Sequence, residues 1–221
     1  MMSKKTPGRA LRNGAVALAF GLMCVCTQSL AAPQGWTLHL VWSPDYCEDD
    51  LTSKEPQCTE ERYFTIDGLQ PRFDGDKPDC VDERLSDEEA ERWMTTIPNR
   101  AQIKKTWKRQ GACSGLDSAG YYTQLERGSR RVLVPAEFSD VTEARHTTVQ
   151  AAKAAFIRDN PGLGVDAIAL DCHGRSLAGV SVCFDADFQY QACSIAARCG
   201  AGELRVKPLR DSRIGREPIY R

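Results

Sequence analysis

The sequence predicts an α+β fold with a mostly antiparallel central sheet, flanking helices and about four disulfides. Two observations carry this prediction. Patterns typical of strands stand towards both ends of the chain, with patterns typical of helices between them. Eight cysteines remain once an N-terminal export segment is set aside, and an even number in an exported chain is typical of a disulfide framework.

Residues 1–32 have the composition of a secretory signal peptide. Four basic residues precede an apolar run over 15–25, and the small residues of 29–32 offer a cleavage site. A membrane anchor is the competing interpretation, but the run is far shorter than the roughly 20 apolar residues that span a bilayer. We therefore expect one domain over 33–221, periplasmic or secreted, with no membrane span in the mature form.

The eight remaining cysteines favour disulfides over a metal site. They allow roughly a hundred pairings, so their number alone does not choose a framework. No CxxC pair occurs, and the three histidines, His39, His146 and His173, are dispersed along the chain. We expect neither a metal nor a cofactor.

The charge changes sign along the chain. Residues 45–91 hold 17 acidic and 5 basic side chains, whereas the chain from 92 onward holds 13 acidic and 20 basic ones. A polyanion would meet repulsion over the first part and attraction over the second. Ordinary solvated surface charge accounts equally well for most of these residues.

The first half of the domain predicts two strands and two helices. Residues 36–42 and 63–68 are rich in aromatic and β-branched side chains, and a polar loop bracketed by Cys47 and Cys58 separates them. Ser86 and Glu89 have the spacing of a capping box that opens a short helix through Met94. Residues 100–109 form the second helix candidate.

The second half predicts helices followed by strands. Asp117 is placed to cap a helix running towards Leu125, and residues 147–158 form the strongest helical stretch, stopped by an Asn-Pro-Gly sequence. Two apolar segments, 165–172 and 177–184, return to strand character with a His-Gly turn between them.

Two segments resemble the catalytic segments of the ribonuclease T2 family, which read roughly FTIHGLWP and HEWxKHGTC. They are residues 63–71 (YFTIDGLQP) and 107–113 (WKRQGAC). The opening strand with its following Tyr-Cys, and the late strand 177–185 (LAGVSVCFD), extend the resemblance over nearly the whole mature chain. Residues 111–115 (GACSG) are especially similar to bacterial periplasmic members.

The resemblance implies a complete disulfide framework and a folded scaffold. By analogy the pairs are Cys80 with Cys113, Cys183 with Cys193 inside Cys172 with Cys199, and Cys47 with Cys58. The residues that are retained serve packing, turning and bridging, whereas the altered ones face substrate in the family. This division favours a folded protein reused for another purpose.

Both histidines that the family uses for catalysis are replaced. Asp67 stands at the position of the general acid, and Gln110 stands at that of the general base. An imidazole both takes and gives a proton near neutrality, whereas a carboxylate is already ionised there and an amide has no useful basicity. Losing a positioned acid or base typically costs about 10²- to 10⁴-fold in rate.

The neighbouring site positions differ as well. Lys105 and Thr106 replace a histidine and a glutamate, while Arg109 keeps the positive charge of a lysine and is suited to bidentate phosphate binding. Gln70 replaces a tryptophan of the base pocket, which removes a stacking contribution of roughly 1–3 kcal/mol per base. Gln70, Lys108 and Arg109 are the candidate substrate-binding residues.

Two functions of different classes follow from these residues. The first is a catalytically impaired protein that binds single-stranded RNA or a nucleotide through the basic run 104–109, or that binds a protein partner such as an active ribonuclease or an envelope component. The alternative is a working endoribonuclease that forms a 2′,3′-cyclic phosphate with a reorganised site, for instance with Asp67 as base and Lys105 as electrostatic stabiliser. His39 is the histidine that could replace the missing ones, although a lone histidine between Leu38 and Leu40 is more often structural.

Overall fold

The computed structural model describes residues 2, 32–48, 53–60, 62–196 and 198–209. The expected signal peptide, apart from residues 2 and 32, lies outside the described residues. Among the residues that are described, no helix is long and apolar enough to cross a bilayer.

One mixed sheet organises the described part of the chain. Its strands run in the order β2-β1-β5-β6-β3, and β4 pairs with β5 beside this path. All strand pairs are antiparallel except β5 with β6. The strands are β1 (Gly35–Trp42), β2 (Phe64–Arg72), β3 (Arg145–Thr148), β4 (Ile168–His173), β5 (Ser176–Asp185) and β6 (Glu203–Val206).

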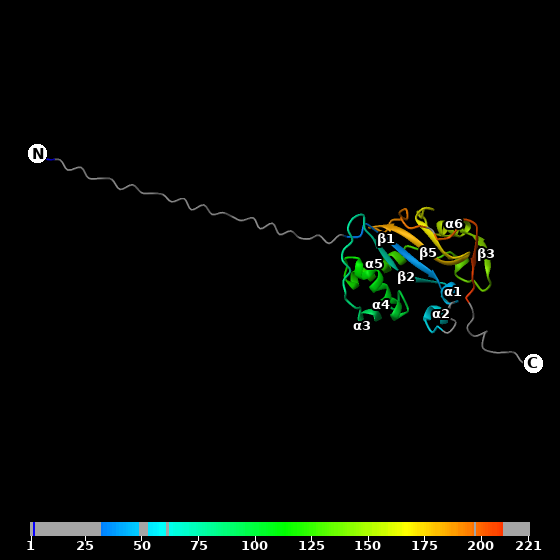
Figure 1. Cartoon of the computed structure of the whole chain (residues 1–221). Coiled ribbons are helices and arrows are strands. Elements are labelled where there is room, and N and C mark those ends of the chain that lie inside the picture. The colour runs from blue at the N-terminus through cyan, green and yellow to red at the C-terminus, as the bar shows by residue number, and fades with distance from the viewer. Residues whose placement is uncertain (1, 3–31, 49–52, 61, 197, 210–221) are drawn as a thin grey trace, which may run out of the picture.

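The helices gather around this sheet, with α3, α4 and α5 at the β2 end and α6 beside β3 (Figure 1). Side-chain caps fix where the longer ones begin: Asn99 caps α4, Asp117 caps α5 and Thr148 caps α6. The α-helices are α1 (Ser43–Tyr46), α2 (Pro56–Thr59), α3 (Asp87–Glu91), α4 (Arg100–Arg109), α5 (Ser118–Ser129) and α6 (Val149–Asp159). Two 3₁₀ turns, η1 (Gly111–Cys113) and η2 (Ala136–Phe138), complete the set.

Strand β1 has one apolar face and one more polar face. The side chains at 36, 38, 40 and 42 are buried aromatic and aliphatic groups that pack in the hydrophobic core. The intervening positions carry Thr37, His39 and Val41, which lie opposite Cys183, Ser181 and Gly179 of β5. Because side chains alternate along a strand, the second face of the sheet holds polar groups beside β2.

The outer edge of β2 is covered by α4 and α5. The Tyr121 hydroxyl lies 3.1 Å from both the N–H and the carbonyl oxygen of Leu69, and the Thr106 hydroxyl donates to the carbonyl oxygen of Asp67 at 2.9 Å. These bonds satisfy backbone groups that an edge strand would otherwise leave unpaired. They also hold α4, whose end carries part of the second segment of the family resemblance, against the first segment.

Four disulfides link the described elements, in the pairing that the resemblance implies. They are Cys47–Cys58, Cys80–Cys113, Cys172–Cys199 and Cys183–Cys193. The α+β architecture with a central sheet, flanking helices and four disulfides is therefore confirmed.

Several element boundaries differ from the sequence prediction. Strand β2 continues beyond residue 68 to Arg72, because its second half pairs with the start of β1. Helix α3 ends at Glu91 rather than at Met94, and turns follow it. Residues 145–148, partly assigned to a helix, form β3 against the unexpected strand β6.

Candidate functional site

Asp67 occupies a β-bulge at the centre of β2. His39 of β1 lies opposite Gly68, and Leu40 lies opposite Ile66, so Asp67 has no partner in the ladder. A bulge re-aims the side chain of the extra residue and bends the strand locally. This irregularity turns Asp67 towards helix α4.

Helix α4 holds Asp67 through three side chains. The Gln102 amide donates to Asp67 Oδ1 at 2.8 Å, and Thr106 donates to the Asp67 carbonyl oxygen at 2.9 Å. Arg109 Nη1 lies 3.9 Å from Asp67 Oδ2, at the limit of an ion pair, and its side chain remains 54% exposed. We call Asp67, Gln102, Thr106 and Arg109 the bulge site.

Gln102 did not stand out in the sequence. The resemblance assigns no role to its position, and the bond to Asp67 depends on the bulge. Its spacing from Thr106, four residues along one helix, is the one available signal, since such residues share a helix face.

Gln110 is buried rather than open to solvent. Its side chain is packed over Gly68, and its Oε1 lies 3.3 Å from the Tyr121 hydroxyl. Gly68 has a φ of +156°, and a Cβ there would lie 2.2 Å from Gln110 Oε1. The glycine therefore makes room for the glutamine amide directly behind the bulge.

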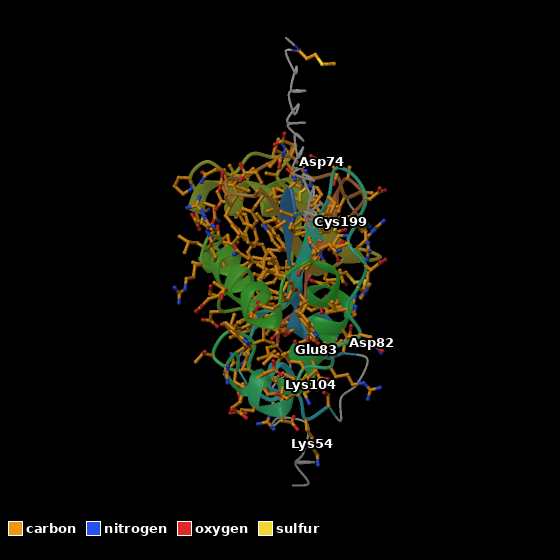
Figure 2. All side chains as sticks on the ribbon, turned by 90° about the vertical axis from the view of Figure 1, so that its left-hand side faces the viewer. Lys54, Asp74, Asp82, Glu83, Lys104 and Cys199 are labelled. Carbon is orange, nitrogen blue, oxygen red and sulfur yellow. A yellow bond between two sulfur atoms is a disulfide. The ribbon has the colours of Figure 1, made fainter. Side chains whose placement is uncertain are left out.

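The basic run of α4 is divided between two flanks of the helix. Lys105, one turn before Arg109, is exposed on the side of the bulge site. Lys104 and Lys108 instead line a cavity of about 330 Å³ between α4 and the segment 81–85. Figure 2 shows Lys104 near Asp82 and Glu83 on this second flank. The structure thus brings Arg109 and Thr106 to Asp67 but not Lys108.

Gln70 is exposed on β2, opposite Thr37 of β1. It lies on the same face of the sheet as His39, since residues two apart on a strand face the same side. The sequence-predicted residues therefore distribute around β2: Gln70 on the sheet face, Asp67 in the bulge, and Gln110 buried beneath it.

A chain of polar groups crosses the sheet beside the bulge. His39 Nδ1 lies 2.8 Å from the Ser181 hydroxyl, which donates to Asp171 Oδ2 at 3.3 Å. Arg198 Nε lies 3.7 Å from Asp171 Oδ1. Burial lowers the pKa of His39 below its ordinary value of 6.5, and the opposing pull of Asp67 and Asp171 does not overcome it.

The described residues contain no cluster of three or more His, Cys, Asp or Glu side chains placed to hold a metal ion.

Several solved ribonuclease structures have the same fold. A mutant of RNase MC1, a protein of bitter gourd seeds, in complex with 5′-UMP matches with a TM-score of 0.61 at 19% identity, covering 78% of this chain and 98% of its own. Trichomaglin, described as an S-like ribonuclease, matches with a TM-score of 0.60 at 15% identity, covering 79% and 96%. The chain has the ribonuclease T2 fold.

RNase NT in complex with 5′-AMP has the same fold, with a TM-score of 0.56 at 17% identity over 79% of this chain and 98% of that one. No protein-family model matches the chain, and no curated protein matches its sequence. The T2 fold is therefore established by three-dimensional similarity.

Proposed function

We propose that this chain is an exported ribonuclease T2-type protein that binds single-stranded RNA or nucleotides at the bulge site, with strongly impaired RNA cleavage. The observation that carries the proposal is the contact between the two segments that resemble the family's catalytic segments. At that contact Arg109 offers an exposed guanidinium, while Asp67 and Gln110 replace the two histidines.

The retained charge supports binding and the replaced groups support impairment. A guanidinium binds a phosphate in bidentate fashion without needing to lose or gain a proton. The Asp67 carboxylate accepts a hydrogen bond from Gln102, and the Gln110 amide is buried. Neither group supplies the proton transfers that the family's reaction requires.

The fold neighbours and the disulfides support the remaining parts of the proposal. RNase MC1 and RNase NT were solved in complex with 5′-UMP and 5′-AMP. Four disulfides favour an oxidising compartment, consistent with a bacterial periplasmic or secreted protein released from its signal peptide.

Binding can be tested with a labelled oligouridylate and fluorescence anisotropy over a range of salt concentrations. We expect salt-dependent binding that Arg109→Ala weakens, with a salt slope reduced by about 0.7 for one lost phosphate contact. Lys108→Ala is the matched control, because it removes one positive charge from the adjacent position on the opposite flank of α4.

Three results would contradict the proposal. Absence of salt-sensitive binding would remove RNA as the ligand. Equal losses in Arg109→Ala and Lys108→Ala would show a diffuse electrostatic attraction rather than a site. Rapid cleavage of polyuridylate by the purified protein would contradict the impairment.

A further inference from the structure

His39 faces the bulge site from the neighbouring strand. It lies directly opposite Gly68 in the ladder, beside the bulge that holds Asp67, and the Asp67 carboxylate acts on it electrostatically. The alternate residues Leu38 and Leu40 fill the core, which leaves His39 on the more polar face with Ser181. A histidine thus stands beside the site from which both family histidines are missing.

The polar chain through Ser181 sets the tautomer of the imidazole. We assign the single hydroxyl proton of Ser181 to Asp171, because a carboxylate only accepts hydrogen bonds. The Ser181 oxygen therefore accepts from His39 Nδ1–H, at 2.8 Å. This arrangement leaves Nε2 as the basic nitrogen, and no hydrogen bond occupies it among the described residues.

Four charged groups on neighbouring elements act on His39 electrostatically. Asp67 of β2 and Asp171 of β4 favour its protonated form, while Arg109 of α4 and Arg198 favour the neutral form. Ser181 is fully buried and His39 is partly buried, so the ring is held in place while keeping access to solvent. A fixed, neutral imidazole with a free Nε2 is the form that accepts a proton.

We propose that His39 is the general base of a slow residual RNA cleavage at the bulge site, with Ser181 and Asp171 as positioning residues. The inference rests on the proposed binding of RNA at this site. The ribose 2′-hydroxyl passes its proton to His39 Nε2, and the 2′ oxygen forms a bond to phosphorus. The bond from phosphorus to the 5′ oxygen breaks, leaving a 2′,3′-cyclic phosphate and a 5′-hydroxyl.

The departing 5′ oxygen takes its proton from water, since Asp67 stands where the family has the histidine that protonates it. His39 then returns its proton to solvent. A base without a matching acid supplies part of the family's chemistry, which is consistent with a rate far below that of a complete site.

The test is the release of cyclic phosphate from polyuridylate between pH 4 and 8 by the mature protein. We expect slow cleavage whose rate rises as His39 loses its proton and levels off above its pKa. His39→Gln should lower the rate by about 10²-fold or more while oligouridylate binding persists. His146→Gln, at an exposed histidine of β3 whose partner is the exposed Glu203, is the matched control and should keep the full rate.

Ser181→Ala tests the positioning role. It removes the hydroxyl that holds Nδ1, so we expect a lower kcat with an altered pH profile, and little change in KM. Identical purification of every variant identifies a contaminating nuclease, because its activity would be the same in all of them.

The outcomes separate the two proposals. Binding without cleavage in the wild-type protein, or equal cleavage by His39→Gln, would overturn the role of His39 and leave the proposed function standing. A protein that neither binds nor cleaves would overturn both. Cleavage lost in His39→Gln with binding intact would support both.

Discussion

Individual residues of the bulge site depend on neighbours that lie far away in sequence. Asp67, Thr106 and Arg109 could be singled out because they lie in, or directly before, two segments that resemble a known pattern. The burial of Gln110 and the bond from Gln102 to Asp67 could not, because both depend on how α4 covers the edge of β2. His39 gains its role only through strand register, with Ser181 lying 142 residues away.

Gly68 is the residue whose replacement should disturb the site most directly. In Gly68→Ala the new methyl group would collide with Gln110, and the positive φ is one that side chains rarely adopt. We expect a loss of about 1–3 kcal/mol in the free energy of unfolding, measured by urea denaturation. Gly75→Ala is the control, because a Cβ there meets nothing within 4 Å. A loss of stability no larger in Gly68→Ala than in the control would contradict this account of the packing of Gln110 over Gly68.

The titration of His39 should make the free energy of unfolding depend on pH. Its pKa lies below the ordinary value of 6.5, mainly because of burial, so the unfolded chain binds this proton more readily than the folded one. The stability that His39 contributes is complete above about pH 6.5 and is lost as the pH falls through the folded pKa. His39→Gln should remove this component from unfolding free energies measured between pH 4 and 8. An unchanged pH dependence in this variant would argue against the lowered pKa.

At the scale of elements, helix α4 divides the basic run 104–109 between two surfaces. Its helical period sends Lys105 and Arg109 to the bulge site and Lys104 and Lys108 to the cavity beside residues 81–85. The start and end of α4 were predictable, since Asn99 caps it and Gly111 follows its last turn. Its docking against the β2 edge was not, because hydrogen bonds to a strand edge leave no periodic signature in sequence.

An ionic network centred on the buried Asp45 joins α1 to the segment that follows β6. Asp45 is 3% exposed, and its carboxylate lies 2.6 Å from both Lys207 Nζ and His173 Nδ1. Lys207 also pairs with Glu48, and its carbonyl oxygen accepts from the Trp42 indole at 3.1 Å. This network fixes the late segment beside the end of β1.

Removal of Asp45 should therefore cost much more than removal of a surface ion pair. Asp45→Ala leaves the mostly buried Lys207 ammonium short of a partner, and we expect a loss of about 3 kcal/mol. Glu137→Ala breaks an exposed pair with Arg158 and should cost less than about 1 kcal/mol. Urea unfolding of both variants measures the two losses. Similar urea concentrations at the midpoints of unfolding would show that the Asp45 network contributes little to stability.

At the scale of the whole molecule, the α+β class was predictable and the complete sheet was not. The long strands β1 and β5 bury alternate or continuous apolar side chains, which leaves a clear pattern. Strand β3 has no buried residue and β6 has two, so neither four-residue strand carries enough periodicity to be recognised. The disulfide pairing came from family resemblance, because cysteine number alone leaves roughly a hundred choices.

The disulfides should stabilise the molecule unequally, according to the chain that each one closes. Cys80–Cys113 spans 33 residues and ties the irregular segment before α3 to the 3₁₀ turn after α4, whereas Cys47–Cys58 spans 11 residues around α1 and α2. Chain entropy favours the longer closure by about 1 kcal/mol, within a typical contribution of about 2–4 kcal/mol each. The double variant Cys80→Ala/Cys113→Ala should therefore unfold at lower urea concentration than Cys47→Ala/Cys58→Ala. Because Cys113 follows the helix that carries Arg109, the first variant should also bind oligouridylate more weakly when no urea is present. The reverse order of stability would show that local strain or packing, rather than loop closure, governs these cross-links.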